Sequence, residues 1–255
     1  MRIAFDVIGS KEKAVAIIDS RPNGKEKQVA KDIMSRYNHI KSVLVKRSPR
    51  GGIYRIYNLR IAGGSRKTEV IHKEHGMLFK LDPKKVFFSP RESTERQRLA
   101  EKVKKKERVL VMFSGIAPIA IAIAKKQPEA EIVCIEINND AVDYANENLR
   151  LNMTYNIRNY CWDVRDAAGL GRFNRIIMPL PEKAVEYLDV AFKAAKKGAI
   201  IHLYGISRQK DFSDFKEKVK LAAKQHNRKI RVLSSQKVLP YAPYRMKIRL
   251  DIKVL

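Results

Sequence analysis

The apolar positions in the second part of the chain form runs of the kind found in buried sheets. Residues 109–113 are an uninterrupted apolar run of strand length, which is typical of a strand covered on both faces. Residues 116–126 are rich in Ala and Ile and predict a helix, and residues 132–137 predict a second buried strand. The three segments form a βαβ unit that places Glu136 at the carboxyl end of its second strand.

The same alternation continues to the C-terminal end of the chain. It predicts strands at residues 159–162, 175–178 and 198–204, helices at residues 140–151, 182–195 and 211–226, and two last strands at residues 230–237 and 247–254. No helix separates the last two strands, so we expect them to pair antiparallel. Class I methyltransferases close their sheet in this way, whereas dinucleotide enzymes usually keep βαβ units to the end. We therefore predict a class I (Rossmann-like) α/β domain over residues 84–255.

The first 83 residues show shorter and more mixed patterns. They predict strands at residues 2–8, 14–18, 42–46 and 53–61, a helix at residues 24–37, a turn at residues 48–52 and a hairpin at residues 68–72 and 77–81. Gly63-Gly64 is expected to end the strand at residues 53–61. This pattern predicts a small α+β module that ends near residues 82–83.

Residues 84–98 connect the two parts and hold the densest charged cluster of the chain. Ser93 is expected to cap a helix, which continues as a basic helix over residues 98–106. Arg91, Glu95, Arg96 and Arg98 lie between the module and the domain, which is a favourable place for a binding site. A solvated, charged helix start would have the same composition, so the pattern alone leaves both interpretations open.

The charge of the chain changes this picture. Lys and Arg number 53 against 27 Asp and Glu, which gives a net charge of +26 and a pI near 10.1. Such a field attracts polyanions, and nucleic acid is the partner it favours. The excess is spread along the chain and not held in a tail, so both parts are expected to face the nucleic acid. We therefore expect residues 1–83 to dock a nucleic acid, which the resemblance described below implies to be RNA.

Other compositional features place the protein in the cytoplasm. No apolar stretch reaches the length of a membrane span, and the N-terminal residues carry acidic side chains that a signal peptide would lack. Cys134 and Cys161 fall in predicted buried strands and lack metal-ligand spacing, so we expect structural thiols. We expect a monomer that does not bind a membrane.

The βαβ unit offers a nucleotide site of a particular kind. Ser114-Gly115 follows its first strand, and the carboxylate of Glu136, about 20 residues later, is placed to bind ribose hydroxyls. The turn has one glycine and no phosphate-binding lysine, so a nucleoside without phosphates fits better than a dinucleotide. S-adenosylmethionine is the common ligand of that kind. An ordinary βαβ crossover with a solvated Glu136 remains equally open at this point.

Several short stretches together carry a resemblance to a known family. They are residues 68–76, 86–91, 93–96, 112–115 with Pro118, 163–165, 177–181, 198–204 and 241–243. Together they resemble the archaeal and eukaryotic tRNA guanosine-37 N1-methyltransferase family over essentially the whole chain, although the family's separate N-terminal domain is unmatched. The Ser-Pro-Arg and Ser-Thr-Glu-Arg residues within 89–96 are the most specific part.

The resemblance implies roles for individual residues. S-adenosylmethionine would be bound by Phe113, Ser114, Gly115, Glu136, Ile137, Asp163 and Pro179. Glu95 would be the general base, and Arg55 would contact the target guanine. Arg91, Arg96, Phe87 and Pro181 would bind the tRNA nucleotide.

The implied reaction explains these residue types. N1 of guanine carries a proton, which a carboxylate within hydrogen-bond reach can take. Negative charge then develops on O6, where a guanidinium would stabilise it. The methyl group of the donor is already activated, so no metal is required. Arg91, Arg96 and Arg98 are expected to surround Glu95 and to lower its pKa.

The sequence departs from the family pattern at a few positions. Val111 stands in place of an aspartate and Ala117 in place of a glycine in the donor loop, and Phe87 stands in place of a tyrosine. Pro179 replaces an asparagine that helps to hold the donor and the target base. Two alternatives therefore stay open: the related aminocarboxypropyl transferase of the wybutosine pathway, and a degenerate RNA-binding paralogue. Retention of Glu95, Arg55, Glu136 and Asp163 argues against the paralogue.

Overall fold

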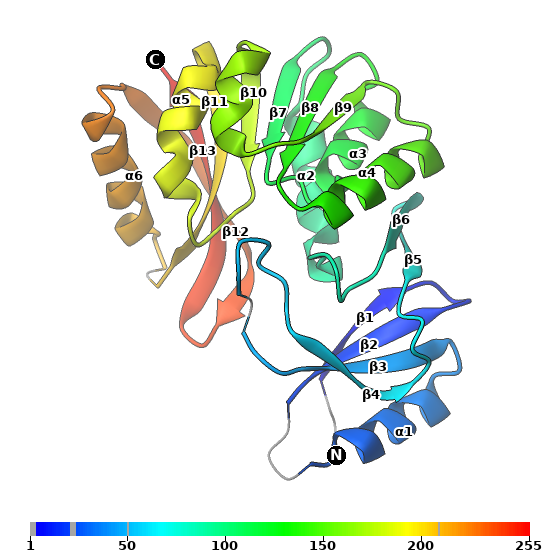
Figure 1. The fold of residues 1–255 in the computed structure, drawn as a ribbon. Helices are drawn as coiled ribbons and strands as arrows, with labels where there is room; N and C mark the ends of the chain where they lie inside the picture. The colour runs from blue at the N-terminus through cyan, green and yellow to red at the C-terminus, as the bar shows by residue number, and fades with distance from the viewer. Residues whose placement is uncertain (1–3, 21–23, 50, 209) are drawn as a thin grey trace.

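The computed structural model describes residues 4–20, 24–49, 51–208 and 210–255, which form two larger sheets and a two-stranded hairpin (Figure 1). The first sheet has the order β1-β2-β3-β4. Its elements are β1 (Phe5–Gly9), β2 (Ala14–Asp19), α1 (Glu26–Arg36), β3 (Ile40–Lys46) and β4 (Leu59–Gly64). β2 and β3 are parallel, and the other two pairs are antiparallel. Arg2 and Ile3 of the first predicted strand, and Arg50 of the predicted turn, lie outside the described residues.

The position of β4 corrects one sequence-based expectation. The strand expected at residues 53–61 begins only at Leu59 and runs on through Gly63-Gly64, which were expected to end it. A Cβ atom on Gly63 would lie 2.9 Å from Cβ of Ala30 in α1, and one on Gly64, at φ +86°, would lie 2.3 Å from the Lys41 carbonyl oxygen. The two glycines therefore allow α1 and β3 to approach β4 closely and do not break the strand.

The second sheet has seven strands in the order β12-β13-β11-β10-β7-β8-β9. They are β7 (Arg108–Met112), β8 (Glu131–Glu136), β9 (Ile157–Cys161), β10 (Phe173–Met178), β11 (Ala195–Ser207), β12 (Ile230–Ala242) and β13 (Arg245–Val254). The five strands β11, β10, β7, β8 and β9, which are neighbours in this order, run parallel. β13 pairs antiparallel with both β11 and β12. This order confirms the predicted α/β class and the closing antiparallel pair.

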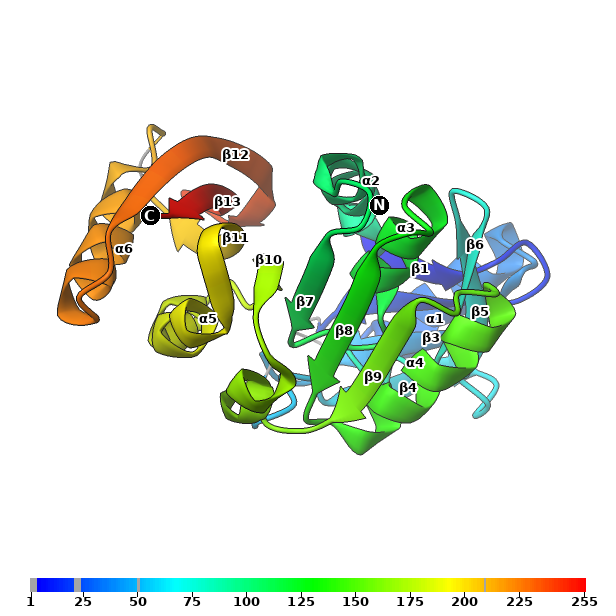
Figure 2. The ribbon, with the colours of Figure 1, turned by 90° about the horizontal axis from the view of Figure 1, so that it is seen from above.

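Helices cover both faces of this sheet (Figure 2). They are α3 (Pro118–Lys126) and α4 (Asn139–Leu151) on one face, and α5 (Leu188–Ala194) and α6 (Ser213–Gln225) on the other. Val109 and Val111 of β7 pack in the cluster that holds α3 and α4, whereas Leu110 and Met112 pack with α5 and α6. Val109 to Met112 are therefore all apolar, because both faces of β7 are buried there. No helix in the described part of the chain is long and apolar enough to cross a membrane.

Helix boundaries differ from the expectations at two places. Helix α2 (Ser93–Lys102) follows directly on the short 3₁₀ helix η1 (Pro90–Glu92), so Ser93 lies inside the helix and does not cap it. The helix ends at Lys102 and not at Lys106, because Val103 is extended and buried in the core. The predicted helix at residues 182–195 is divided into the 3₁₀ helix η3 (Ala184–Tyr187) and α5.

The two cysteines differ in burial. Cys134 is buried in β8, and its burial raises the pKa of the thiol to about 12, as suits a structural thiol. Cys161 at the end of β9 is exposed, so the expectation that both thiols are buried is wrong for this one. β9 is the edge strand of the sheet, and the thiol of Cys161, its last residue, donates to Oδ1 of Asn139 at the start of α4.

A hairpin of β5 (Val70–Glu74) and β6 (Met77–Leu81) lies between the two sheets (Figure 1). Asn148 of α4 and Asn152, which directly follows this helix, exchange side-chain hydrogen bonds with the backbone of Lys80 and Leu78 in β6. Residues of the first sheet, the hairpin and the second sheet share one apolar cluster. The boundary placed after residue 83 stays a prediction, because the hairpin packs on both parts.

A row of buried polar side chains crosses the second sheet. Arg175 of β10 donates from Nη1 to Nε2 of His202 in β11 at 2.7 Å, and Nδ1 of His202 lies 2.6 Å from Oδ1 of Asp251 in β13. Because a guanidinium is always protonated, Nε2 of His202 accepts and Nδ1 carries the proton that it donates to Asp251. Asp251 also accepts from Nε of Arg249 at 2.8 Å. The row therefore consists of a neutral histidine between charged neighbours.

Gly205 of β11 supplies a test of how α6 packs. A Cβ atom there would lie 2.1 Å from the ring of Phe215, which is buried in α6. We expect Gly205→Ala to lower the free energy of unfolding by about 1–3 kcal/mol, because the helix must shift away from the sheet. Urea unfolding measures this loss. Gly169→Ala is the control, since a Cβ there meets nothing within 4 Å, and equal midpoints for the two variants would contradict the packing.

The buried histidine predicts a pH dependence of stability. Burial lowers the pKa of His202 from 6.5 to about 4, so between these values the unfolded chain binds a proton that the folded chain does not. Stability is then full above about pH 6.5 and falls by about 3 kcal/mol as the pH drops to about 4. Urea unfolding over this range measures it. His202→Gln removes the titrating group and should flatten the dependence, and equal slopes for both proteins would rule out this cause.

Candidate active site

Glu95 lies in the first turn of α2 and is only 4% exposed. Its Oε1 accepts a hydrogen bond from the Tyr204 hydroxyl at 2.7 Å and another from Nη1 of Arg249. Its Oε2 is also buried but has no hydrogen-bond partner among the described residues; Nη1 of Arg98 lies 3.9 Å away. One oxygen of the carboxylate is thus held twice, and the other is available to accept a proton.

Of the three arginines that the sequence indicated around Glu95, Arg98 lies near it, but Arg91 and Arg96 pair with other carboxylates. Arg91 is exposed and donates from Nε to Oδ1 of Asp6 at 2.6 Å. Arg96 is 3% exposed and forms a two-pronged ion pair with Glu74, at 2.7 Å from Nε to Oε1. The expectation that Arg91 and Arg96 surround Glu95 is therefore wrong, because carboxylates of the first sheet and the hairpin take both side chains.

Arg249 and Tyr204 were missed in the sequence. A signal for Arg249 does exist: an arginine stands among the apolar residues of a strand, in Ile-Arg-Leu-Asp-Ile at residues 248–252. A charge at such a position requires a buried partner. The sequence pattern does not say which carboxylate is that partner, since Glu95 lies more than 150 residues earlier.

The predicted donor loop follows β7 and is organised by Glu136. The carboxylate of Glu136 accepts backbone N–H groups from Gly115 at 2.9 Å, from Ile137 at 2.9 Å and from Asn138 at 3.0 Å. It therefore joins the turn after β7 to the turn after β8. A carboxylate has about four acceptor positions, so Glu136 keeps capacity for further donors such as ribose hydroxyls.

The backbone of this loop is in the left-handed region at three residues. Phe113, Gly115 and Ala117 have φ values of 54°, 56° and 64°. Ala117 thus adopts the conformation that a glycine would adopt at lower cost, which explains why the family pattern has a glycine there. Ser114 of this loop is buried, and its backbone N–H donates to the Ile135 carbonyl oxygen at 3.1 Å. The altered residue therefore does not prevent the loop from forming.

Aromatic contacts connect the remaining residues of the predicted donor site. The ring of Phe113 packs edge-on against Tyr187, with 5.1 Å between centroids. The guanidinium of Arg165 lies 5.3 Å from the centre of the same Tyr187 ring and pairs with Asp163 at 2.7 Å. Phe113 and Asp163 are thus brought to one end of the sheet around Tyr187, a residue that the sequence analysis did not single out.

The segment before α2 lies against this loop. A Cβ atom on Gly115 would lie 3.9 Å from the carbonyl oxygen of Phe87, and Nδ2 of Asn138 donates to the Lys85 carbonyl oxygen at 3.1 Å. The segment that leads into the helix of Glu95 is therefore fixed beside the predicted donor site. Phe87 therefore lies beside the predicted donor loop, and the roles that the sequence implied for Glu95, Phe87 and this loop stay predictions.

Arg55 and Pro181 lie at a second location, around Glu182. Arg55, with φ 52°, pairs with Glu182, and the Tyr241 hydroxyl donates to the same carboxylate. Three segments far apart in the chain thus meet at Glu182, which directly follows Pro181. Pro179 follows the end of β10 in the same segment. The interactions described for Arg55 are with this segment and not with Glu95.

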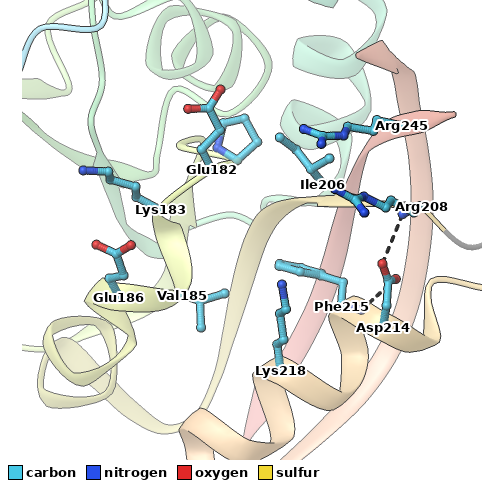
Figure 3. A pocket seen from close by; sticks show the side chains of 11 residues that line it. Glu182, Lys183, Val185, Glu186, Ile206, Arg208, Asp214, Phe215, Lys218 and Arg245 are labelled. Carbon is cyan, nitrogen blue, oxygen red and sulfur yellow. Dashed lines mark hydrogen bonds between the residues drawn. The ribbon is translucent and has the colours of Figure 1, made fainter. Parts of the chain in front are cut away.

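A cavity of about 670 Å³ opens beside this second place (Figure 3). Pro181 is the one predicted site residue in its lining, and the cations around it are Lys183, Arg208, Lys218 and Arg245. A smaller cavity, of about 40 Å³, is lined by Phe87 and residues of the first sheet. Neither cavity is lined by Glu95 or Glu136. The chemistry is therefore located by the side-chain geometry and not by the larger cavity.

Comparisons with known proteins show which family this chain resembles in sequence. The model of a family described as the TRM5/TYW2 methyltransferase domain matches residues 70–233. The tRNA (guanine(37)-N(1))-methyltransferase Trm5b of Pyrococcus abyssi is 35% identical over 98% of this chain and 74% of its own. A tRNA(Phe) (4-demethylwyosine(37)-C(7)) aminocarboxypropyltransferase of Methanocaldococcus jannaschii is 31% identical over 84% of this chain and 86% of its own.

The fold is shared with a solved structure as well. This chain is similar to the protein in the complex structure of aTrm5 and tRNALeu, with a TM-score of 0.86 and 30% sequence identity. The match covers 100% of this chain and 72% of the aTrm5 chain. The family match spans more than half of the chain, and the resemblance noted in the sequence is confirmed. The chain belongs to the TRM5/TYW2 methyltransferase family.

Proposed function

We propose that this protein transfers a methyl group from S-adenosylmethionine to N1 of guanosine 37, next to the anticodon of tRNA. The observation that carries the proposal is the buried carboxylate of Glu95, with one oxygen held by Tyr204 and Arg249 and the other without a partner. This arrangement suits a base that must stay ionised until it takes a proton. The 35% identity to a tRNA (guanine(37)-N(1))-methyltransferase supports the same reaction.

The donor loop fits S-adenosylmethionine. Glu136 is fixed by three backbone N–H groups and keeps acceptor positions for the ribose hydroxyls, and Phe113 and Ile137 flank it. Ser114 and Gly115 form the close turn, Asp163 would accept from the adenine amine, and Pro179 would close the site. When bound, S-adenosylmethionine supplies a methyl group that is already activated by its positive sulfur. The residues of the chain then have to orient the target base and remove its proton.

Glu95 would remove the proton from N1 of guanine. Its Oε2, which has no hydrogen-bond partner among the described residues, would accept that proton. The lone pair left on N1 would then form the bond to the methyl carbon as the bond between that carbon and the donor sulfur breaks and leaves its electron pair on the sulfur. Because Oε1 remains bound to Tyr204 and Arg249, the carboxylate does not have to rotate during the transfer. Arg55 would stabilise the charge on O6 by exchanging its contact with Glu182 for the guanine.

The remaining predicted residues would serve the tRNA. Arg91 is exposed and can contact a phosphate, and Phe87 and Pro181 would shape the site of the extracted nucleotide. Arg96 is buried against Glu74, so we assign it to holding the segment before α2 and not to direct RNA contact. We propose that residues 1–83 dock the tRNA, that residues 84–255 carry out the transfer, and that the protein acts as a cytoplasmic monomer.

The reaction is tested with unmodified tRNA transcripts that carry G or A at position 37. After incubation with S-adenosylmethionine, nucleoside mass spectrometry should show a gain of one methyl group on the G transcript alone, because only guanine presents a proton at N1 that Glu95 can take. A gain of an aminocarboxypropyl group would assign the chain to the activity of the M. jannaschii relative. Binding of tRNA with no gain of mass would contradict both transferase assignments.

The base is tested with Glu95→Gln, which keeps the shape of the side chain but cannot take a proton. We expect the single-turnover rate of methyl transfer to fall by about a hundredfold or more, while the affinity for S-adenosylmethionine stays within about twofold. Glu101→Gln is the matched control, since Glu101 is an exposed residue of the same helix. Undiminished transfer by Glu95→Gln would remove Glu95 from this role.

A further inference from the structure

The side chains around Glu95 form a buried charged group in which each member has a defined partner. Glu95, Tyr204, Arg249 and Asp251 are all at most 4% exposed. They come from α2, β11 and β13, so three segments far apart in the chain meet here. Buried charges of this kind must be paired, yet a stable fold alone would be served as well by apolar residues. The pairing therefore calls for a functional reason.

Arg249 is held from two sides. Its Nε donates to Oδ1 of Asp251 at 2.8 Å, and its Nη1 donates to Oε1 of Glu95. Asp251 is itself fixed, because His202 and the hydroxyl of Ser234 contact it at 2.6 and 2.8 Å and Lys102 lies 3.3 Å away. The planar guanidinium thus has one orientation in which both of its carboxylate partners are satisfied.

The contacts on Glu95 are unequal. Tyr204 and Arg249 both donate to Oε1, whereas Oε2 faces the more distant guanidinium of Arg98 and has no hydrogen-bond donor among the described residues. The other nearby cation, Lys247, lies over the ring of Tyr204 and pairs with Glu92. Among the described neighbours, only Arg249 therefore combines a full charge with a hydrogen bond to the base.

We infer that Arg249, oriented by Asp251, is a positioning residue of the reaction, which holds the Glu95 carboxylate by one oxygen and leaves the other free to take the proton. The inference rests on the proposed function, because it assigns to Arg249 the placement of the base in that reaction. Arg249 also keeps a positive charge beside a carboxylate whose burial would otherwise favour the protonated form. The pKa of Arg249 itself is raised above its ordinary value, since Tyr204 and Glu95 outweigh the effect of burial.

The test is the pH dependence of single-turnover methyl transfer between about pH 6 and pH 9. Removing a cation from contact with a carboxylate favours its protonated form, so Arg249→Met should move the acidic limb of the profile to higher pH. We expect a loss of about severalfold near pH 6 that largely recovers near pH 9. Arg249→Lys, which keeps the charge, should restore much of the rate at low pH.

Two further measurements distinguish an effect on the base from a loss of binding or of folding. Affinity for S-adenosylmethionine and for the tRNA transcript should change little in Arg249→Met, and circular dichroism at each pH checks that the variant is folded. If that variant does not fold, Tyr204→Phe removes the other hydrogen bond to Oε1 and should shift the acidic limb in the same direction by a smaller amount.

A folded Arg249→Met variant with the wild-type profile, or with an equal loss at every pH, would overturn the inference. So would a Tyr204→Phe profile that does not move when the arginine variant cannot be studied. In either case methyl transfer by the wild-type protein would leave the proposed function standing. Failure of the wild-type protein to methylate the transcript would instead remove the proposed function, on which the inference rests.

Discussion

The burial of the Glu95 carboxylate is the constraint on which the arrangement of the site depends. A carboxylate that is removed from water remains charged only where donors and a cation contact it. Here the cation is Arg249 of β13 and the second donor is Tyr204 of β11. The requirement fixes α2 against the antiparallel end of the sheet. The segment before α2 also lies beside the predicted donor loop, so the helix that carries Glu95 is joined to both ends of this arrangement.

The predicted donor loop differs from the surroundings of Glu95, because it is held by contacts within a single βαβ unit. Glu136 accepts backbone N–H groups from Gly115, Ile137 and Asn138, and all of them lie in the two turns at the ends of β7 and β8. Such a loop follows from the βαβ unit itself and tolerates Ala117 in a left-handed conformation. This explains why the sequence could predict the βαβ unit and the place of Glu136 at the end of its second strand, whereas the surroundings of Glu95 could not be predicted.

The fold was predictable where a repeating pattern decides it. The continuous apolar run of β7 and the alternation of strand and helix led to the seven-stranded sheet and its closing pair. The pattern failed at Gly63-Gly64, where close packing of α1 and not a turn requires glycine, and at Ser93, where a preceding 3₁₀ helix makes a side-chain cap unnecessary. It also failed for Arg91 and Arg96, because a neighbour in sequence is not a partner in space. Asp6 and Glu74, which take these arginines, come from strands that only the tertiary fold brings close.

Some arginines of this chain pair with a buried carboxylate, and others contribute to the charge of the surface. The composition does not distinguish these two groups. Arg96 with Glu74, Arg175 with Glu107 and Arg249 with Glu95 each bring together one positive and one negative side chain. Each pair is neutral, so these arginines add nothing to the field outside, and the whole excess of +26 is left to the remaining side chains. The acids that these pairs use are no longer available to offset lysines and arginines on the surface. Without these three pairs, 50 Lys and Arg stand against 24 Asp and Glu, so the net charge of +26 is unchanged while the proportion of cations among the remaining charges rises, which suits a polyanionic partner.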